Sequence, residues 1–224
     1  MSFFVKLYLI SCVIISLMII KPHVFVIGDS ISIQYGPFLE EYTKDICIYD
    51  RKRDNGESLI NLNIPIGANG GDSKMVLDYL KVLQLKQTFN PEYLLINCGL
   101  HDIKTNTKTG EKQISIGCYI SNLDSIINIT KEMNLKLIWI NTTPVCDSIH
   151  NTKNMGFYRF NKDVELYNKI SDSICKVNNI PIIDLYSFSS KFPLSAYKDH
   201  VHYESKYQKL QALYITEFIK KTIQ

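Results

Sequence analysis

The run His23–Ile27 and the turn that follows it constrain this chain more than any other stretch. The four residues before Gly28 are all apolar, which is typical of a strand in a parallel sheet covered on both faces. Gly28 lets the backbone turn sharply at the end of that strand, and Asp29 and Ser30 follow it. Sites in open α/β sheets are built at the carboxyl ends of strands. The sequence therefore predicts Ser30 at the rim of a sheet, where a nucleophile can react.

Short apolar runs alternate with helical periodicity along the rest of the chain. Strands are also expected over 93–98, 136–141 and 180–185, with one more over either 45–49 or 62–66. Helices are expected over 38–42, 74–85, 114–133, 161–177 and 205–221, with residues 31–37 as a loop and 145–159 as an irregular loop. This alternation predicts a parallel sheet between helix layers, joined by right-handed crossovers. We therefore expect a single α/β domain over residues 23–224 with a five-stranded parallel sheet.

The first 22 residues form a separate segment. Lys6 precedes an uncharged, almost wholly apolar run from Leu7 to Ile20. Its length suits the apolar region of a secretory signal and is short for a span of about 20 residues. No good cleavage site precedes Lys21, so residues 1–22 are expected to be a signal peptide or a membrane anchor. The expected location is extracytoplasmic, as a secreted, periplasmic or anchored protein, and a buried N-terminal helix is the alternative.

Charge and cysteine usage exclude several classes of protein. The net charge of +3 is spread over 224 residues, and the densest basic run, 51–53, is followed at once by Asp54. This pattern predicts no nucleic-acid partner. The six cysteines form no Cys-x-x-Cys pair, which argues against a zinc ribbon or a thioredoxin-type motif. Cys47 and Cys98 lie in apolar runs and are expected in the core.

Polar residues past the expected strand ends, or in loops, form one constellation. Such positions converge on one edge of a doubly wound sheet. The Ser30 hydroxyl needs a base to become nucleophilic, and His202, oriented by Asp199, can take its proton near neutral pH. An oxyanion hole needs donors aimed at the developing negative oxygen. The candidates are the backbone N–H groups of Ser30 and Gly71 and the side chain of His101.

Four blocks in this order resemble the SGNH/GDSL hydrolases over nearly all of the chain after residue 22. The blocks are Gly28-Asp29-Ser30, Gly71 within a glycine turn, Gly99-x-His101-Asp102 and Asp199-x-x-His202. The resemblance implies a three-layer α/β/α, flavodoxin-like fold and serine ester hydrolysis without a metal or other cofactor. It makes Ser30 the nucleophile, His202 the base and Asp199 its orienter, with Gly71 as an oxyanion donor.

One residue departs from the family pattern, which usually has Asn where this chain has His101. A subgroup with Gly-Leu-His-Asp resembles this chain, so we interpret His101 as a substituted oxyanion donor. A histidine must hold an N–H toward the substrate, so its tautomer matters. Asp102 is expected either to orient His101 or to cap the next segment. The Gly-x-Ser-x-Gly elbow of the α/β-hydrolases is absent, because Ile31 and Ser32 follow the serine.

The resemblance and the export-like N-terminus together favour deacylation, above all deacetylation, of a carbohydrate or another small acyl ester. An O-acyltransferase on the same residues and a lipase or thioesterase are alternatives, and a lipase is expected to show a larger apolar surface near its site. Further alternatives are a non-catalytic carbohydrate-binding protein and a metallohydrolase built on Asp199, His200 and His202. The expected partner is a small-molecule or carbohydrate ester, with a membrane tether through the N-terminal segment as a further option.

Overall fold

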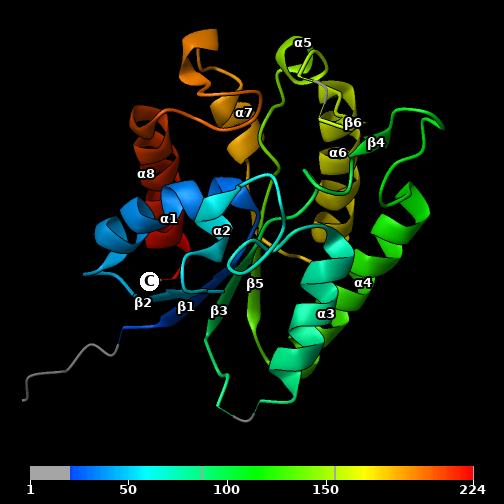
Figure 1. Ribbon diagram of the computed structural model, residues 1–224. Coiled ribbons are helices and arrows are strands. Elements are labelled where there is room, and N and C mark those ends of the chain that lie inside the picture. The colour runs from blue at the N-terminus through cyan, green and yellow to red at the C-terminus, as the bar shows by residue number, and fades with distance from the viewer. Residues whose placement is uncertain (1–20, 87, 154, 224) are drawn as a thin grey trace, which may run out of the picture.

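The computed structural model of this protein describes residues 21–86, 88–153 and 155–223. Its centre is a five-stranded sheet in which all neighbours run parallel, in the order β2-β1-β3-β5-β7 (Figure 1). The strands are β1 (His23–Ile27), β2 (Ile48–Arg51), β3 (Tyr93–Ile96), β5 (Lys136–Ile140) and β7 (Ile182–Ile183). The order corresponds to a doubly wound, flavodoxin-like sheet. The predicted fold class and strand number are therefore confirmed.

Helices cover both faces of the sheet (Figure 1). On one face lie α1 (Ser30–Thr43) and α8 (Ser205–Thr222), which pack against each other; on the other lie α3 (Ser73–Gln84), α4 (Ile116–Glu132) and α6 (Asn161–Val177). The strands β1, β3 and β5 fill the middle of the sheet and are almost wholly buried. This double cover explains why their sequences are continuous apolar runs rather than alternating ones.

The helix α1 begins at Ser30 and includes residues 31–37, so the predicted loop there is wrong. The Asp29 carboxylate accepts the Ile31 N–H at 2.9 Å and caps the helix. Pro37 lies inside the helix and removes one backbone donor. The apolar face of α1, which includes Tyr35 and Leu39, is buried, and helices in proteins draw most of their stability from such packing. The packing of this face therefore keeps the backbone helical at Pro37, where the sequence pattern predicted a loop.

The other differences lie at the sheet edge and in the connections. Of the two candidates for the second strand, 45–49 overlaps β2 at Ile48 and Tyr49, and the strand begins three residues later than predicted; 62–66 forms no strand. The span 145–159 contains α5 (Asp147–His150) and β6 (Phe157–Tyr158), and β6 pairs antiparallel with β4 (Thr105–Asn106). The remaining short elements are α2 (Glu57–Ile60), α7 (Leu185–Ser189) and a 3₁₀ turn, Leu194–Ala196. Two-residue strands carry no periodicity, so pattern alone does not reveal the small second sheet.

The predicted signal or anchor falls on residues that the structure does not describe, apart from Lys21 and Pro22. Within the described ranges, no helix has the length and apolar content that a membrane span requires. Cys47 and Cys98 are buried, as predicted.

A buried arginine ties the sheet edge to the first turns of α1. Arg51, in β2, donates from Nη1 to the Ser32 carbonyl at 2.6 Å and from Nη2 to Ser32 Oγ at 3.1 Å. Arg53, two residues further along the chain, is about half exposed and pairs with Asp50 and Glu40. The pair provides a matched comparison of a buried and an exposed arginine.

We expect Arg51→Met to lower the free energy of unfolding by about 2–4 kcal/mol, because it leaves buried acceptors at Ser32 without donors. Arg53→Met is expected to cost no more than about 1 kcal/mol, because exposed ion pairs contribute little. Urea denaturation of the two variants measures the difference. Equal losses of stability would show that Arg51 does not hold α1 in place.

Candidate active site

The turn between β1 and α1 packs directly against the glycine turn that precedes α3. The Gly70 N–H donates to the Gly28 carbonyl at 2.8 Å. A Cβ on Gly70 would lie 3.0 Å from that same oxygen, so the close approach requires glycine. Ser30 is the first residue of α1, and its N–H therefore has no acceptor within the helix. The sequence thus places a serine, a helix N-terminus and a second turn at one point on the sheet edge.

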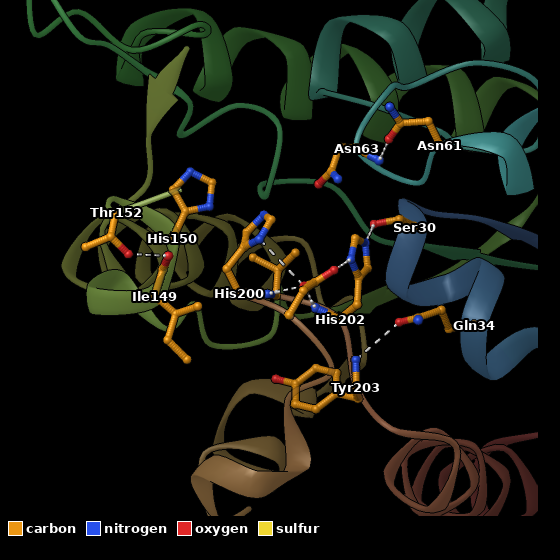
Figure 2. Close-up of polar contacts among 12 residues, drawn as sticks. Ser30, Gln34, Asn61, Asn63, Ile149, His150, Thr152, His200, His202 and Tyr203 are labelled. Carbon is orange, nitrogen blue, oxygen red and sulfur yellow. Dashed lines mark hydrogen bonds and ion pairs between the residues drawn. The ribbon is translucent and has the colours of Figure 1, made fainter. Parts of the chain in front are cut away.

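Ser30, His202 and Asp199 form one hydrogen-bonded chain, although Ser30 and His202 lie 172 positions apart (Figure 2). The Ser30 Oγ lies 2.8 Å from His202 Nε2, and His202 Nδ1 lies 2.7 Å from Asp199 Oδ2. A carboxylate accepts hydrogen bonds and donates none, so Nδ1 carries the proton of a neutral ring. Nε2 is then free to accept the hydroxyl proton of Ser30.

The loop that carries His202 is held by its own hydrogen bonds. Asp199 Oδ1 accepts the N–H groups of Val201 and His202, each at 2.9 Å. Burial favours the neutral form of Asp199, but the hydrogen bond and charge of His202 and these backbone donors outweigh it. The pKa of Asp199 therefore lies below its usual range. Asp199 is thus a carboxylate at any ordinary pH.

Gly71 lies in the glycine turn with φ at +73°. A Cβ there would overlap Met75 Sδ and lie 3.0 Å from Pro65 Cβ, so both conformation and space require glycine. Its N–H donates to Asn69 Oδ1 at 3.0 Å. A bound oxygen would have to share this donor with Asn69 or displace it.

His101 is almost fully buried, with 1% of its surface exposed, and its Nδ1 has no hydrogen-bond partner among the residues that the structure describes. Burial, together with the charges of Lys104 and Arg159, holds the pKa of His101 well below its usual range. The ring is therefore neutral near pH 7 and carries one N–H.

Asp102 has neither of its two expected roles. Both of its oxygens accept the Ser73 N–H, at 3.0 and 3.1 Å. The carboxyl group therefore caps the start of α3, a helix that precedes Asp102 in the chain. Burial raises the pKa of this carboxyl to about 7.

Two further histidines extend the row from Ser30 and His202 (Figure 2). The ring of His200 lies 4.4 Å from that of His150 and 6.3 Å from that of His202, measured between centroids. Burial lowers the pKa of both His150 and His200 to about 4, so these rings are neutral near pH 7. No sequence pattern indicated a place for His150 beside the site, because it lies in the span expected to be an irregular loop.

The residues of the metallohydrolase alternative lie close together, with Asp199 oxygens 2.7 Å from His202 Nδ1 and 3.7 Å from His200 Nδ1, but they are not arranged as metal ligands. His202 Nε2 is directed at Ser30 (Figure 2), and Asp199 binds the other ring nitrogen, Nδ1. Over the part of the chain that the structure describes, no three His, Cys, Asp or Glu side chains are arranged to hold a metal ion.

The layered sheet, with a serine, a histidine and an aspartate linked at its carboxyl edge, defines the class of α/β/α serine hydrolases. A family model for GDSL-like lipases and acylhydrolases matches residues 24–215. The chain belongs to this family and is an SGNH-type serine hydrolase.

Solved structures share this fold at low sequence identity. A Bacteroides fragilis protein described as an acylhydrolase is 21% identical, with a TM-score of 0.67 and 91% of each chain covered. An acetyl xylan esterase is 17% identical, with a TM-score of 0.64, covering 87% of this chain and 98% of its own. The esterase EstA from Pseudoalteromonas is 16% identical, with a TM-score of 0.60, covering 89% of this chain and 97% of its own. Curated proteins give no match.

Proposed function

We propose that the protein hydrolyses an acyl ester with Ser30 as nucleophile, His202 as general base and Asp199 as the group that orients His202. The observation that carries this proposal is the unbroken chain of hydrogen bonds from Ser30 Oγ through His202 to Asp199, at 2.8 and 2.7 Å. Both bonds lie within the range of good hydrogen bonds before any substrate is bound.

The reaction follows from this geometry. Ser30 Oγ bonds to the carbonyl carbon while its proton passes to His202 Nε2, and the carbonyl oxygen becomes negative. His202 then returns the proton to the leaving alcohol oxygen as the ester bond breaks, which leaves an acyl group on Ser30. A water molecule repeats the sequence on the acyl-serine and releases the carboxylic acid. Asp199 stabilises the imidazolium in both halves of the reaction.

The developing negative oxygen needs donors, and we propose three groups for this role. The Ser30 N–H is free of intrahelical acceptors and lies at a positive helix end. The Gly71 N–H and the neutral ring of His101 complete the proposed oxyanion hole. Gly71 would donate to the substrate oxygen either by sharing its N–H with Asn69 Oδ1 or by releasing that oxygen.

For the substrate, we propose a small acyl group, acetyl above all, on a carbohydrate. Ser30 and His202 are each 2% exposed, which favours a short acyl group over a long one. One structural neighbour is an acetyl xylan esterase. The apolar run 7–20 supports a location outside the cytoplasm, where carbohydrate polymers are accessible.

An exposed apolar stretch near the site favours a second candidate, hydrolysis of longer-chain esters. Leu59 and Ile60 are 67% and 84% exposed, and Ile64 and Ile66 are also exposed. Pro65, within the same stretch, lies against Gly71. Apolar surface of this kind beside a site can hold an acyl chain, so the preferred chain length separates the two candidates.

We expect Ser30→Ala to lower kcat on p-nitrophenyl acetate by about 10⁴-fold or more, because the nucleophile is lost. Asp199→Asn is expected to cost about 10²–10⁴-fold, because an amide donor facing Nδ1 places the ring proton on Nε2. Ser121→Ala, an exposed position on α4, serves as the control. A series from acetate to octanoate esters measures chain preference.

Two results would contradict this proposal. Activity of Ser30→Ala close to that of the wild type would exclude the serine mechanism, and loss of wild-type activity with a chelator would favour a metal-dependent one. A rate that rises from acetate to octanoate would favour the longer-chain candidate.

His101→Asn is expected to keep much of the activity, because an amide also donates, whereas His101→Ala should lower kcat by about 10²–10³-fold. Because burial holds the pKa of His101 well below its usual range, the ring is neutral near and above neutral pH, and His101→Asn should leave the pH–rate profile there unchanged. Steady-state kinetics from pH 5.5 to 9 test both statements. A kcat of His101→Ala equal to that of the wild type would show that His101 is not a donor of the oxyanion hole.

A further inference from the structure

Two cations near His101, Lys104 and Arg159, lie against one aromatic ring, that of Phe157. The Lys104 ammonium and the Arg159 guanidinium carbon are each 4.9 Å from the centroid of the Phe157 ring. The pairing of β4 with β6 sets Asn106 opposite Phe157 and Thr105 opposite Tyr158. This small sheet therefore brings together two cations that lie 55 positions apart in the sequence.

Neither cation is neutralised by an acid. Among the described residues, no carboxylate lies within 4.0 Å of Lys104 or Arg159. Arg159 is only 1% exposed, and its Nε donates to the Leu100 carbonyl at 2.9 Å. Its buried Nη1 has no hydrogen-bond partner in the described part of the chain. A buried charge with an unused donor is costly, and a carboxylate is the group that best fits a guanidinium edge.

The acids that act on these cations from farther away already have partners. Asp29 accepts the Ile31 N–H, Asp199 is bound to His202, and Asp72 accepts from Met75 and Gln113. Burial and mutual repulsion lower the pKa of Lys104 to about 8, and burial lowers that of Arg159 to about 10. Both groups are therefore largely charged at neutral pH and lack a close counter-ion.

Space for a ligand lies beside Lys104. A cavity of about 370 Å³ is lined by Lys104, Phe157 and Gln113, among others. The two other charged side chains on its wall are Lys112, which pairs with Asp163, and Glu111, which accepts from Thr109 at the exposed rim. Arg159 binds the carbonyl of Leu100, the residue before His101, so the cationic region adjoins the proposed oxyanion hole.

We propose that Lys104 and Arg159 form a subsite for a carboxylate on the substrate, so that the enzyme acts on acyl esters of acidic sugars such as uronic acids. This inference rests on the proposed serine esterase function and narrows its substrate class. Lys104 supplies a point charge on the cavity wall. Arg159 does not line the cavity; it contacts the same Phe157 ring and would supply its buried Nη1 donor from beside the cavity.

The test compares two substrates that differ in one charge. These are the acetylated methyl glucuronoside as free acid and the same compound as its methyl ester, with acetate release measured. We expect the wild type to favour the acid by about tenfold in kcat/KM, mainly through KM, as for one charge-assisted contact. In Lys104→Met this ratio of the two kcat/KM values should fall about tenfold. In Arg159→Lys it should fall less, because lysine keeps the positive charge but lacks the paired N–H donors of the guanidinium.

The control is Lys136→Met. The Lys136 ammonium also lies over an aromatic ring, 4.8 Å from the Tyr93 centroid, but at the opposite end of the sheet. Lys136→Met should therefore leave the ratio of kcat/KM for the acid to kcat/KM for the methyl ester unchanged. As a second readout, free glucuronate should inhibit p-nitrophenyl acetate hydrolysis competitively in the wild type, and glucose should not. Lys104→Met should raise the glucuronate inhibition constant about tenfold.

Three outcomes would overturn the proposal. Equal kcat/KM for the acid and the ester, with no inhibition by glucuronate, would exclude a carboxylate subsite while Ser30-dependent hydrolysis of p-nitrophenyl acetate stands. Inhibition by inorganic phosphate but not glucuronate would assign the cations to phosphorylated substrates instead. An unchanged ratio in Lys104→Met would show that the two cations only support the fold. Absence of any Ser30-dependent hydrolysis would instead contradict the proposed function itself.

Discussion

The start of α1 is the constraint on which the rest of the site depends. Asp29 caps the helix by accepting the Ile31 N–H, and this fixes Ser30 as the first helical residue. The Ser30 N–H therefore has no acceptor within the helix, and its hydroxyl faces His202 (Figure 2). Arg51 holds the next turn from the sheet edge, and Gly70 packs against the carbonyl of Gly28. A shift of α1 by one residue would move the Ser30 hydroxyl away from His202. It would also move the Ser30 N–H away from the other donors of the proposed oxyanion hole.

Much of this arrangement could be predicted from the sequence because its causes are local. Continuous apolar runs identify buried parallel strands, and the carboxyl ends of such strands meet at one edge, which brings Ser30 and the His101 loop together. The spacing of Asp199 and His202 allows both to lie on one loop. Two predictions from the pattern were wrong. The helix α1 continues through Pro37 because its apolar face is buried, and residues 62–66 form no strand.

The electrostatic surroundings of the site depend on tertiary contacts and could not be predicted. Nothing in the local pattern indicates that Lys104 and Arg159 share the ring of Phe157, or that Asp102 caps α3 rather than orienting His101. The result is an uneven distribution of charge. The acids Asp29, Asp72 and Asp199 all have close partners. Within the described ranges no carboxylate pairs with Lys104 or Arg159, and the rings of His101, His150 and His200 are neutral near pH 7. Such a site stabilises negative charge, on a reacting oxygen and, in our proposal, on the substrate itself.

The central claim is that Ser30 forms a covalent bond during the reaction. Mass spectrometry of the protein after treatment with a fluorophosphonate ester tests it most directly, because such a reagent is attacked by an activated serine and stays bound to it. The account predicts one adduct per chain, mapped to the peptide that contains Ser30, and much slower labelling of His202→Ala. An adduct on another residue, or no adduct on a protein that still hydrolyses esters, would contradict it.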